Sequence, residues 1–567
     1  MSTPVDTVTF EVAAAALQSA AEEMGSVLKR SSYSPIIRDM DDFSCALFTA
    51  DGDLVAQADY IPAQLGAMSL VVKSVLRAWQ GRIRAGDAYI CNHPYQGAMH
   101  LPDVNIVTPI FVGGALMAWA GTAAHHIDVG GVNPGSEGPE LGDLYGEGVV
   151  MPPIRLSIAG EENEDLVALL TENFRDPLST LSDLRAQRAA CHLGAERVHE
   201  LAALYGTAEL LEVMQRMLDG VETTIGRLLS ALPDGAGEAE GALDDDGRGG
   251  DPTRIHARIE KRGGRLAIDL TGCGPQTAGA MNIPWASARA ALVYAVRAVV
   301  APAVSANDGL LRVLDITAPQ GSVVNPLPPA AVSIRHNSCQ RLADTLIHAM
   351  HRIWPDLAVA SSQVSFFSFN IGSTHPRTGA PSVMADVVGG GTGATREGDG
   401  LDGVDTYMAN VGVMPTEVVE TNYNVRILRT EFRPGSQGLG KYHGGLGLVR
   451  EYEILEHPQH ATFYAEQTDA RFAPAGAAGG GDALPTTITV IGPDGAVIDR
   501  PMKTSRVLAP GTVVRVESGG GGGYGDPAER PAELHEWDAR EGRLGGTEAR
   551  SDDDGSSRAS ADPAGRE

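Results

Sequence analysis

Cysteine pairs, aromatic side chains and long apolar runs are all scarce in this sequence. Its 567 residues include five cysteines and no C-x-x-C pair, which argues against a disulfide framework and against a thiolate zinc site. Aromatic residues make up 5% of the chain, whereas glycine is frequent, with 68 residues. This balance favours a turn-rich fold over a helical bundle. We therefore expect a mixed α/β (α+β) chain of several domains with glycine-rich loops.

Positive charge is also in short supply. The 44 Lys and Arg residues face 72 Asp and Glu residues, giving a formal net charge of −28, which repels nucleic acid and anionic membranes. The most apolar long stretch, residues 288–306, is interrupted by Arg289, Arg297 and Pro302 and is too broken to span a bilayer. The N-terminus lacks the basic and apolar segments of a signal peptide. We expect a cytoplasmic protein that binds neither nucleic acid nor membrane.

The pattern of elements predicts two halves and a tail. Residues 1–232 combine helical patterns with β-hairpins, and the Gly- and Asp-rich residues 233–252 are a candidate boundary. Residues 253–525 are expected to form a second α/β half. From Asp526 on, 12 acidic and 6 basic residues with almost no large apolar side chain predict a disordered charged tail over residues 526–567.

The centre of the first half is a predicted β-hairpin. Residues 104–112 are rich in strand formers, Gly113-Gly114 is a two-residue turn, and residues 115–124 run back. In such a hairpin Val112 faces Ala115, so the numbers of paired residues sum to 227.

This pairing gathers polar side chains at the open end of the hairpin. Asp103 is expected opposite Ala124, within one position of His125, and His100 precedes Asp103 by three residues. Asp42 lies at the foot of a second predicted hairpin, whose turn is Asp51-Gly52. Two imidazoles and two carboxylates suit manganese, iron or zinc. The alternative is that each of them is an ordinary polar residue at a strand end.

His126 and Asp128 follow on the same chain segment. Because side chains alternate along a strand, His126 is expected on the face opposite to His125. Either residue could orient a ligand or act as an acid–base group, and a hydrogen-bonded polar residue in a turn is the alternative.

No convincing nucleotide-binding motif is present. Residues 435–442, GSQGLGKY, nearly match a phosphate-binding loop, but Tyr442 stands where Ser or Thr should hold magnesium, and no helix pattern follows. The glycine run at residues 518–526 is interpreted as flexible chain rather than as an anion-binding nest.

Eight motifs together resemble the hydantoinase B/oxoprolinase family, in order from about residue 8 to about residue 530: DFSCALF, DGDLVAQADYIPAQLGAM, NHPYQGAMHLPDV, AHHIDVGGVNPGS, EGVVMPP, DLTGC, GSVVNP and SGGGGGYGDP. The resemblance implies that Asp42, His100, Asp103 and His125 are metal ligands. Two positions depart from the family's pattern: Gln64 replaces a histidine in the IPxHLG segment, and His93 replaces the carboxylate of NDPY.

The resemblance also implies a division of labour. A separate A-type subunit would use ATP and Mg²⁺ to phosphorylate the carbonyl oxygen of a hydantoin, 5-oxoproline or another lactam. This chain, in a hetero-oligomer, would bind one divalent ion (Mn²⁺ or Zn²⁺, with Fe²⁺ possible) and activate the attacking water. One rival within the family is the metal subunit of an ATP-dependent ketone carboxylase of the acetone or acetophenone type. Another is a scaffold subunit without activity.

Overall fold

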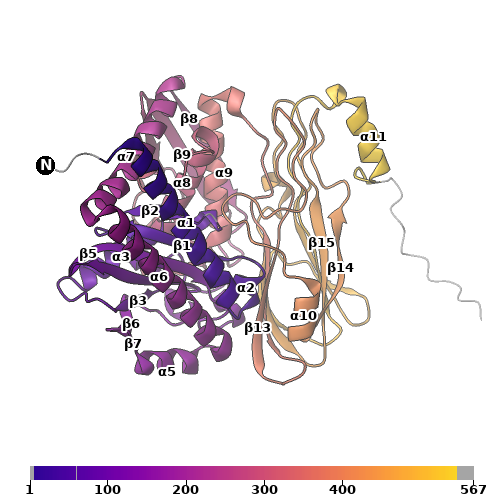
Figure 1. Ribbon diagram of the computed structural model, residues 1–567. Coiled ribbons are helices and arrows are strands. Elements are labelled where there is room, and N and C mark those ends of the chain that lie inside the picture. The colour runs from indigo at the N-terminus through magenta and orange to yellow at the C-terminus, as the bar shows by residue number, and fades with distance from the viewer. Residues whose placement is uncertain (1–4, 59, 65, 546–567) are drawn as a thin grey trace, which may run out of the picture.

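The computed structural model describes residues 5–58, 60–64 and 66–545. Figure 1 shows a part built of helices and sheets, formed by the indigo-to-pink chain, beside a β-rich part formed by the orange and yellow chain. The expected mixed α/β, multi-domain fold with glycine-rich loops is confirmed. Among the described residues, no helix combines the length and apolar content needed to cross a membrane.

A seven-stranded antiparallel sheet organises the first part. Its order is β2-β1-β5-β4-β3-β6-β7. Side chains alternate between its faces: Cys45 and Leu47 belong to one hydrophobic cluster, and Ala46 and Phe48 to another. The strands are β1 (Phe43–Thr49), β2 (Leu54–Gln57), β3 (Ala88–Cys91), β4 (Asp103–Val112), β5 (Ala115–His125), β6 (Ile154–Ile158) and β7 (Glu161–Glu162).

Helices cover both faces of this sheet. The long helices α1 (Thr7–Ser31) and α6 (Pro177–Tyr205) pack against each other and against β1, β4 and β5, and α3 (Met68–Ala78) lies on the opposite face. Asp6 caps α1 by accepting hydrogen bonds from the backbone N–H groups of residues 8 and 9. Three shorter helices border the sheet: α2 (Pro35–Arg38), α4 (Leu144–Glu147) and α5 (Glu164–Asn173).

A second helix-covered sheet has the order β11-β10-β9-β8. Its strands are β8 (Gly235–Leu243), β9 (Thr253–Arg262), β10 (Arg265–Asp269) and β11 (Leu314–Thr317). Helices α7 (Thr207–Ala231), α8 (Trp285–Val300) and α9 (Arg335–Ile353) share its hydrophobic cluster. Its strand β8 also contacts α9, whose first residues reach toward the first sheet.

The C-terminal part contains two further sheets. One has the order β13-β12-β16-β19, and the other β14-β15-β20-β17-β18. The aromatic rings of Phe367, Phe369 and Phe463 on the first sheet contact each other, and Tyr452 of the second sheet contacts Phe367 and Phe369. The elements are β12 (Phe367–Thr374), β13 (Pro381–Val388), α10 (Thr416–Asn422), β14 (Val425–Arg433), β15 (Gly447–Ile454), β16 (Gln459–Tyr464), β17 (Thr487–Ile491), β18 (Val497–Asp499), β19 (Lys503–Leu508) and β20 (Val513–Glu517).

Glycine-rich segments beyond these strands pack backbone against backbone. The N–H of Gly438 donates to the carbonyl of Gly521 (2.8 Å), that of Gly521 to Gly445 (2.9 Å), and that of Gly445 to Thr392 (2.9 Å). Residues 518–523 are buried. The interpretation of the run at residues 518–526 as flexible chain is therefore wrong: its glycines allow several chain segments to approach more closely than side chains would permit.

The disordered tail predicted from Asp526 is wrong for residues 526–545. Helix α11 (Ala532–Arg540) follows Arg530, whose guanidinium contacts Asp538 (2.8 Å) and Asp399 (2.9 Å). Arg543 pairs with Asp402 at 2.6 Å. Arg530 and Arg543 are buried in these ion pairs, whereas the charged side chains of a disordered tail would be solvated. Residues 546–567 lie outside the described residues.

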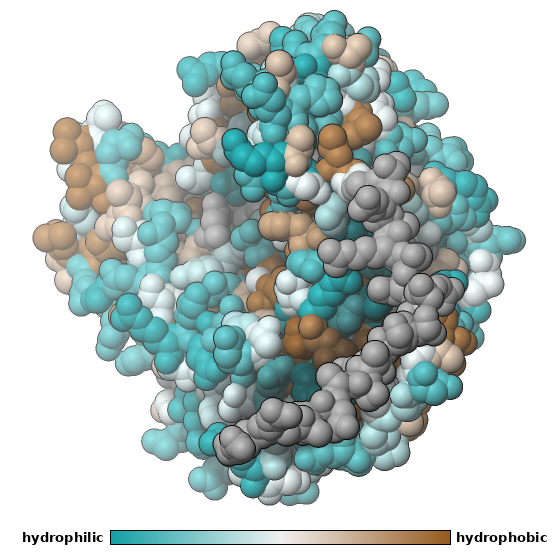
Figure 2. Space-filling view, turned by 90° about the vertical axis from the view of Figure 1, so that its right-hand side faces the viewer, coloured by the Kyte–Doolittle hydropathy of each residue, from teal (hydrophilic) through white to brown (hydrophobic). Residues whose placement is uncertain are grey.

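The face of the molecule shown in Figure 2 is largely hydrophilic, with scattered apolar side chains.

The hydrophobic clusters do not follow the expected division of the chain. One cluster joins Leu17 and Ile106 to Phe369 and Val516, and another joins Ile61 to residues of α8 and α9. Residues 1–232 thus share one hydrophobic core with the C-terminal sheets and contribute to the core around α8 and α9. The boundary at residues 233–252 stays a prediction.

Replacing Gly521 with alanine is expected to destabilise the C-terminal part. The added Cβ would lie 1.8 Å from the carbonyl oxygen of Thr392, and this neighbour is backbone that cannot rotate away. We expect the free energy of unfolding to fall by about 3 kcal/mol. Gly398→Ala is the matched control, since no atom lies within 4 Å of its Cβ position. Equal urea midpoints for the two variants would contradict this account.

Candidate metal centre

The register of three neighbouring strands brings the predicted ligands together. In the sheet β4 pairs with β5 so that Asp103 faces His125, and β1 pairs with β5 so that Phe43 faces Ala124. Asp42 therefore lies beside His125, whose backbone N–H donates to the Asp42 carbonyl (3.1 Å). A register shift between Ile110 and Phe111 places Asp103 opposite His125 instead of the predicted Ala124.

The four side chains converge in a buried place. His100 lies in the turn before β4, with its Nε2 3.2 Å from Asp103 Oδ2. His125 Nδ1 lies 3.6 Å from Asp103 Oδ1 and 3.7 Å from Asp42 Oδ2. One ligand atom from each of His100, Asp103 and His125 falls within 4.8 Å of the others, close enough to hold one metal ion.

The donor set fits a divalent cation. His100 Nδ1 lies 2.8 Å from the carbonyl oxygen of Ser333, so this nitrogen carries the proton and donates. The other nitrogen, Nε2, is buried with no hydrogen-bond partner in the described part of the chain and lies 3.2 Å from Asp103 Oδ2, so its lone pair is free to bind a cation. A backbone carbonyl that fixes one nitrogen of an imidazole is typical of metal-ligating histidines.

The surroundings shift the pKa of three of the candidate ligands. Burial raises the pKa of Asp42 to about 6. Burial also acts against ionisation of Asp103, but the nearby His100 and the Arg335 guanidinium outweigh it and hold its pKa well below the usual range. Burial disfavours the charged form of His125, yet its contacts with Asp103 and Asp42 raise its pKa to about 9. Buried carboxylates that attract a proton onto a neighbouring imidazole also attract a metal cation.

Helix α9 supplies two site residues that the sequence patterns did not indicate. Arg335 Nη2 donates to Asp103 Oδ2 at 2.5 Å, and the ring of His336 lies 5.8 Å from that of His100. Phe366, just before β12, stacks on His336 at 5.0 Å. The adjacent Arg-His pair was visible in the sequence, but nothing in its pattern connected it to the hairpin.

Glu137 completes the wall on the other side of His100. Its Oε1 lies 3.8 Å from His100 Nδ1, and Asn370 Nδ2 donates to its Oε2 (2.8 Å). Tyr464 donates its hydroxyl proton to Glu137 and contacts His336 Nε2 at 2.9 Å. His100, Glu137 and His336 form a second group that could hold a metal ion, and it shares His100 with the first. The family motif AHHIDVGGVNPGS ends one residue before Glu137, which is the nearest signal the sequence offered.

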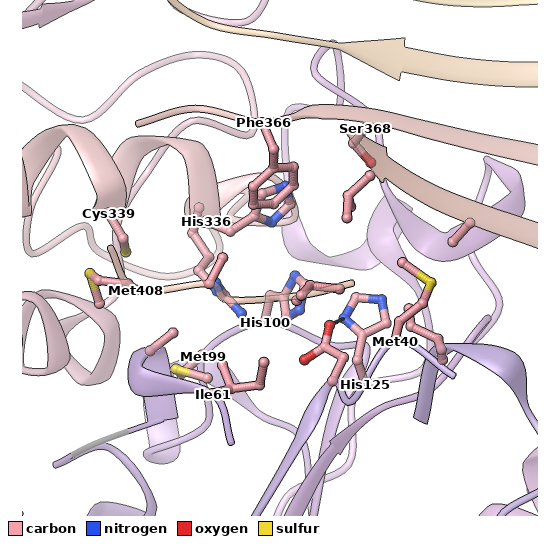
Figure 3. A pocket seen from close by; sticks show the side chains of 18 of the residues that line it. Met40, Ile61, Met99, His100, His125, His336, Cys339, Phe366, Ser368 and Met408 are labelled. Atoms are coloured by element: carbon pink, nitrogen blue, oxygen red, sulfur yellow. Dashed lines mark ion pairs between the residues drawn. The ribbon is translucent and has the colours of Figure 1, made fainter. Parts of the chain in front are cut away.

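A cavity of about 60 Å³ opens beside these residues, room for several waters or a small ring. It lies where the first sheet, α9 and β12 meet. In Figure 3 His100, His125 and His336 face this common space, with Met40, Met99 and Met408 around it. The remaining lining is mostly apolar, with Asp42, Gln64, Glu137, Arg335, Gln340, Ser368 and Asn370 as its other polar members.

The structure does not bring His126 or Asp128 into this cavity. His126 points to the other side of the strand, where its Nε2 contacts Gln187 Oε1 of α6 at 2.9 Å. Asp128 pairs with Arg175 (2.9 Å) and accepts hydrogen bonds from the backbone of Gly130 and Gly135. These contacts are those of hydrogen-bonded polar residues, the alternative given for both positions. A role in catalysis for either residue stays a prediction.

The chain combines a large mixed α/β fold with a His- and Asp-lined cavity between its parts. The sequence matches the hydantoinase B/oxoprolinase profile over residues 6–527, and the chain belongs to this family. It is 32% identical over 550 residues to the B-type subunit of a putative D-/L-hydantoinase from Pseudomonas sp. (strain NS671), covering 93% of this chain and 91% of the relative.

Two solved structures share the fold. An ATP-dependent caprolactamase from Pseudomonas jessenii superposes with a TM-score of 0.88 at 27% identity, covering 95% of each chain. An acetone carboxylase, solved without nucleotide, superposes with a TM-score of 0.84 at 19% identity, covering 94% of this chain and 77% of the other. The expected resemblance is confirmed.

A buried carboxyl group behind the site links its parts. Glu147 of α4 accepts hydrogen bonds at 2.5 Å from the backbone N–H groups of Val332 and Ser333, and the carbonyl of Ser333 is the group that fixes His100. Burial raises the pKa of Glu147 from its ordinary value of 4.5 to about 8.

This raised pKa predicts a pH-dependent stability. Because the folded pKa exceeds the unfolded one, the contribution of Glu147 is fully present below pH 4.5 and is lost as pH rises toward 8. Glutamine keeps the acceptor and does not titrate. Glu147→Gln should therefore gain stability relative to wild type by up to about 1.4 kcal/mol per pH unit between pH 5 and 8. Urea unfolding at pH 5 and pH 8 measures this, and Glu172→Gln, at an exposed position, is the control. If the stability of Glu147→Gln and of wild type changed with pH in parallel, the Glu147 carboxyl would be ionised throughout this range.

Proposed function

We propose that this chain is the metal-dependent subunit of an ATP-dependent cyclic-amide hydrolase that acts with an A-type partner. The observation that carries the proposal is the convergence of Asp42, His100, Asp103 and His125 at one end of an enclosed, mostly apolar cavity. The caprolactamase supports a lactam-type substrate, since this chain covers 95% of its length. The missing phosphate-binding motif supports a partner that handles ATP.

The reaction needs an activated amide because amide carbonyls resist attack. The partner would transfer the γ-phosphoryl group of ATP to the carbonyl oxygen. Water then adds to the same carbon, the C–N bond breaks to give a ring-opened acyl phosphate, and a second water releases phosphate. The chemistry that a divalent ion supplies is Lewis acidity, which brings the pKa of a coordinated water from 15.7 to about 7.

The residues of this chain hold and orient the reacting groups. Ser333 fixes the tautomer of His100, and Arg335 holds Asp103 in its ionised form. The stacked Phe366 and the Tyr464 hydroxyl fix the ring of His336 at the cavity wall. The apolar lining excludes bulk water from the ring of the substrate, which strengthens the electrostatic contacts inside the site.

A ketone carboxylase is the second candidate. The same residues would hold a divalent ion whose positive charge would stabilise an enolate, and the enolate would attack a carboxyl donor made from bicarbonate and ATP. The acetone carboxylase chain is less fully covered, at 77% of its length, and the low identity shows the fold alone. This difference in coverage favours the hydrolase.

Metal content is the first test of the site. Wild type should hold about one ion of manganese, zinc or iron per chain. His125→Ala removes a donor and Asp42→Asn replaces a charged carboxylate with a neutral amide oxygen, so each should lose at least tenfold in metal affinity. Elemental mass spectrometry of the purified chain measures this. His93→Ala is the control, since His93 Nδ1 accepts from the Tyr95 backbone and does not line the cavity. A folded wild-type chain that takes up no metal, with or without the partner, would overturn the proposed site.

Activity is the second test. The complex with an A-type subunit should hydrolyse a hydantoin or lactam only with ATP, and His125→Ala should lower kcat by a factor of about 10³ or more, because the water would no longer be activated. Release of ADP and of ring-opened product measures this. Hydrolysis by this chain alone without ATP would contradict the division of labour, and stoichiometric incorporation of labelled bicarbonate into a ketone would favour the carboxylase.

A further inference from the structure

Gln64 is a buried side chain in the cavity that the fold does not use. It ends the short 3-10 helix Pro62–Gln64 between β2 and α3, and it is 1% exposed. Its side chain lines the cavity, yet neither Oε1 nor Nε2 has a hydrogen-bond partner among the described residues. The backbone around it is held in place, because Gln64 N–H donates to Ile61 (3.1 Å) and Ala63 N–H donates to Met408 (2.7 Å).

An unpartnered buried carboxamide is costly. Each donor or acceptor left without a partner in an apolar place costs about 1–3 kcal/mol, and native structures contain few such groups. Ile61, Met99 and Met408, which line the same cavity, offer no hydrogen bond. A ligand that satisfies both atoms of Gln64 would recover this cost on binding.

We infer that Gln64 is a substrate-recognition residue that pairs with the amide edge of a neutral ring of the hydantoin type, an inference that rests on the proposed function. A carboxamide presents an acceptor and a donor side by side in one plane. A ring forces its amide into the cis form, so its N–H and C=O also point the same way, and the two groups can form a pair of hydrogen bonds. An open-chain secondary amide is trans, with N–H and C=O pointing in opposite directions, and offers Gln64 only one of them.

The charged groups that line the cavity favour a neutral substrate over an anionic one. Arg335 is the one guanidinium or ammonium group among the described residues that line it; its Nη2 donates to Asp103, and its Nε has no partner among them. The carboxyl groups of Asp42 and Glu137 line the same cavity, so Arg335 is the one group of this kind that faces them there, and a neutral ring fits better than 5-oxoproline, which would add a further carboxylate. A hydantoin also has a second amide edge, which remains available to Gln64 when the first carbonyl oxygen is phosphorylated.

Binding of hydantoin to the full-length, metal-loaded chain tests this by isothermal titration calorimetry. Gln64→Leu keeps the side-chain volume and removes both hydrogen bonds, and we expect it to weaken hydantoin binding roughly ten- to a hundredfold. Gln57→Leu is the matched control: Gln57 is also buried with an unpartnered carboxamide, but it does not line the cavity. Metal content should match wild type in both variants, and the thermal midpoint should not fall in either, because each substitution removes buried polar atoms that have no partner.

A second probe separates recognition of the ring from general affinity. Wild type should bind hydantoin more tightly than N-acetylglycine N-methylamide, a neutral open-chain diamide whose amides are trans, and Gln64→Leu should lose this preference. Unchanged hydantoin affinity in Gln64→Leu, or no hydantoin binding by wild type, would overturn the inference. Gln64→Glu is the second variant if leucine impairs folding: it retains an acceptor but loses the donor and adds a charge, so it should also weaken binding at least tenfold.

The two proposals fail in different ways. Gln64-dependent hydantoin binding without ATP-dependent hydrolysis in the complex would retain the recognition role and refute the hydrolase. ATP-dependent hydrolysis with the same KM in wild type and Gln64→Leu would retain the hydrolase and refute the recognition role.

Discussion

The structure depends on the antiparallel register of β1, β5 and β4. This register places Asp42, His125 and Asp103 side by side at one end of the sheet, where water is largely excluded. Buried carboxylates are unfavourable unless opposite charge is near. The fold supplies part of that charge through Arg335 and through the imidazole of His125, and a divalent cation would supply the rest. Helix α9 and the C-terminal part pack around these charged side chains and limit their exposure to water.

Enclosure requires all three regions of the chain. The first sheet and the turns at its end contribute the candidate ligands, the start of α9 contributes Arg335 and His336, and the C-terminal part contributes Phe366, Asn370 and Tyr464. A site built between packed parts is largely shielded from solvent, and its polar groups can be oriented by residues that lie far apart in sequence. Glu147 shows this connection, because its hydrogen bonds tie α4 to the segment that fixes His100.

The glycine-rich C-terminal segments follow another constraint. Their chains approach so closely that a Cβ at Gly444, Gly445 or Gly521 would lie 1.8 Å from a carbonyl oxygen of a neighbouring segment. Backbone hydrogen bonds replace side-chain packing there. Glycine-rich sequences that predict flexible loops are thus buried here. Their backbone groups bond to segments that are distant in the sequence, and a local pattern does not show those partners.

Local sequence determined the hairpins and the choice of Asp42, His100, Asp103 and His125 as candidates, because turn chemistry and strand periodicity act over a few residues. Even there, the register shift near Ile110 moved the partner of Asp103 by one position. Only the tertiary structure decided that β1 pairs with β5, that Arg335 and Glu137 join the site, and that Gln64 is left without a partner. Those contacts join residues as much as 232 positions apart, and they depend on strand order and packing, which short-range patterns do not encode.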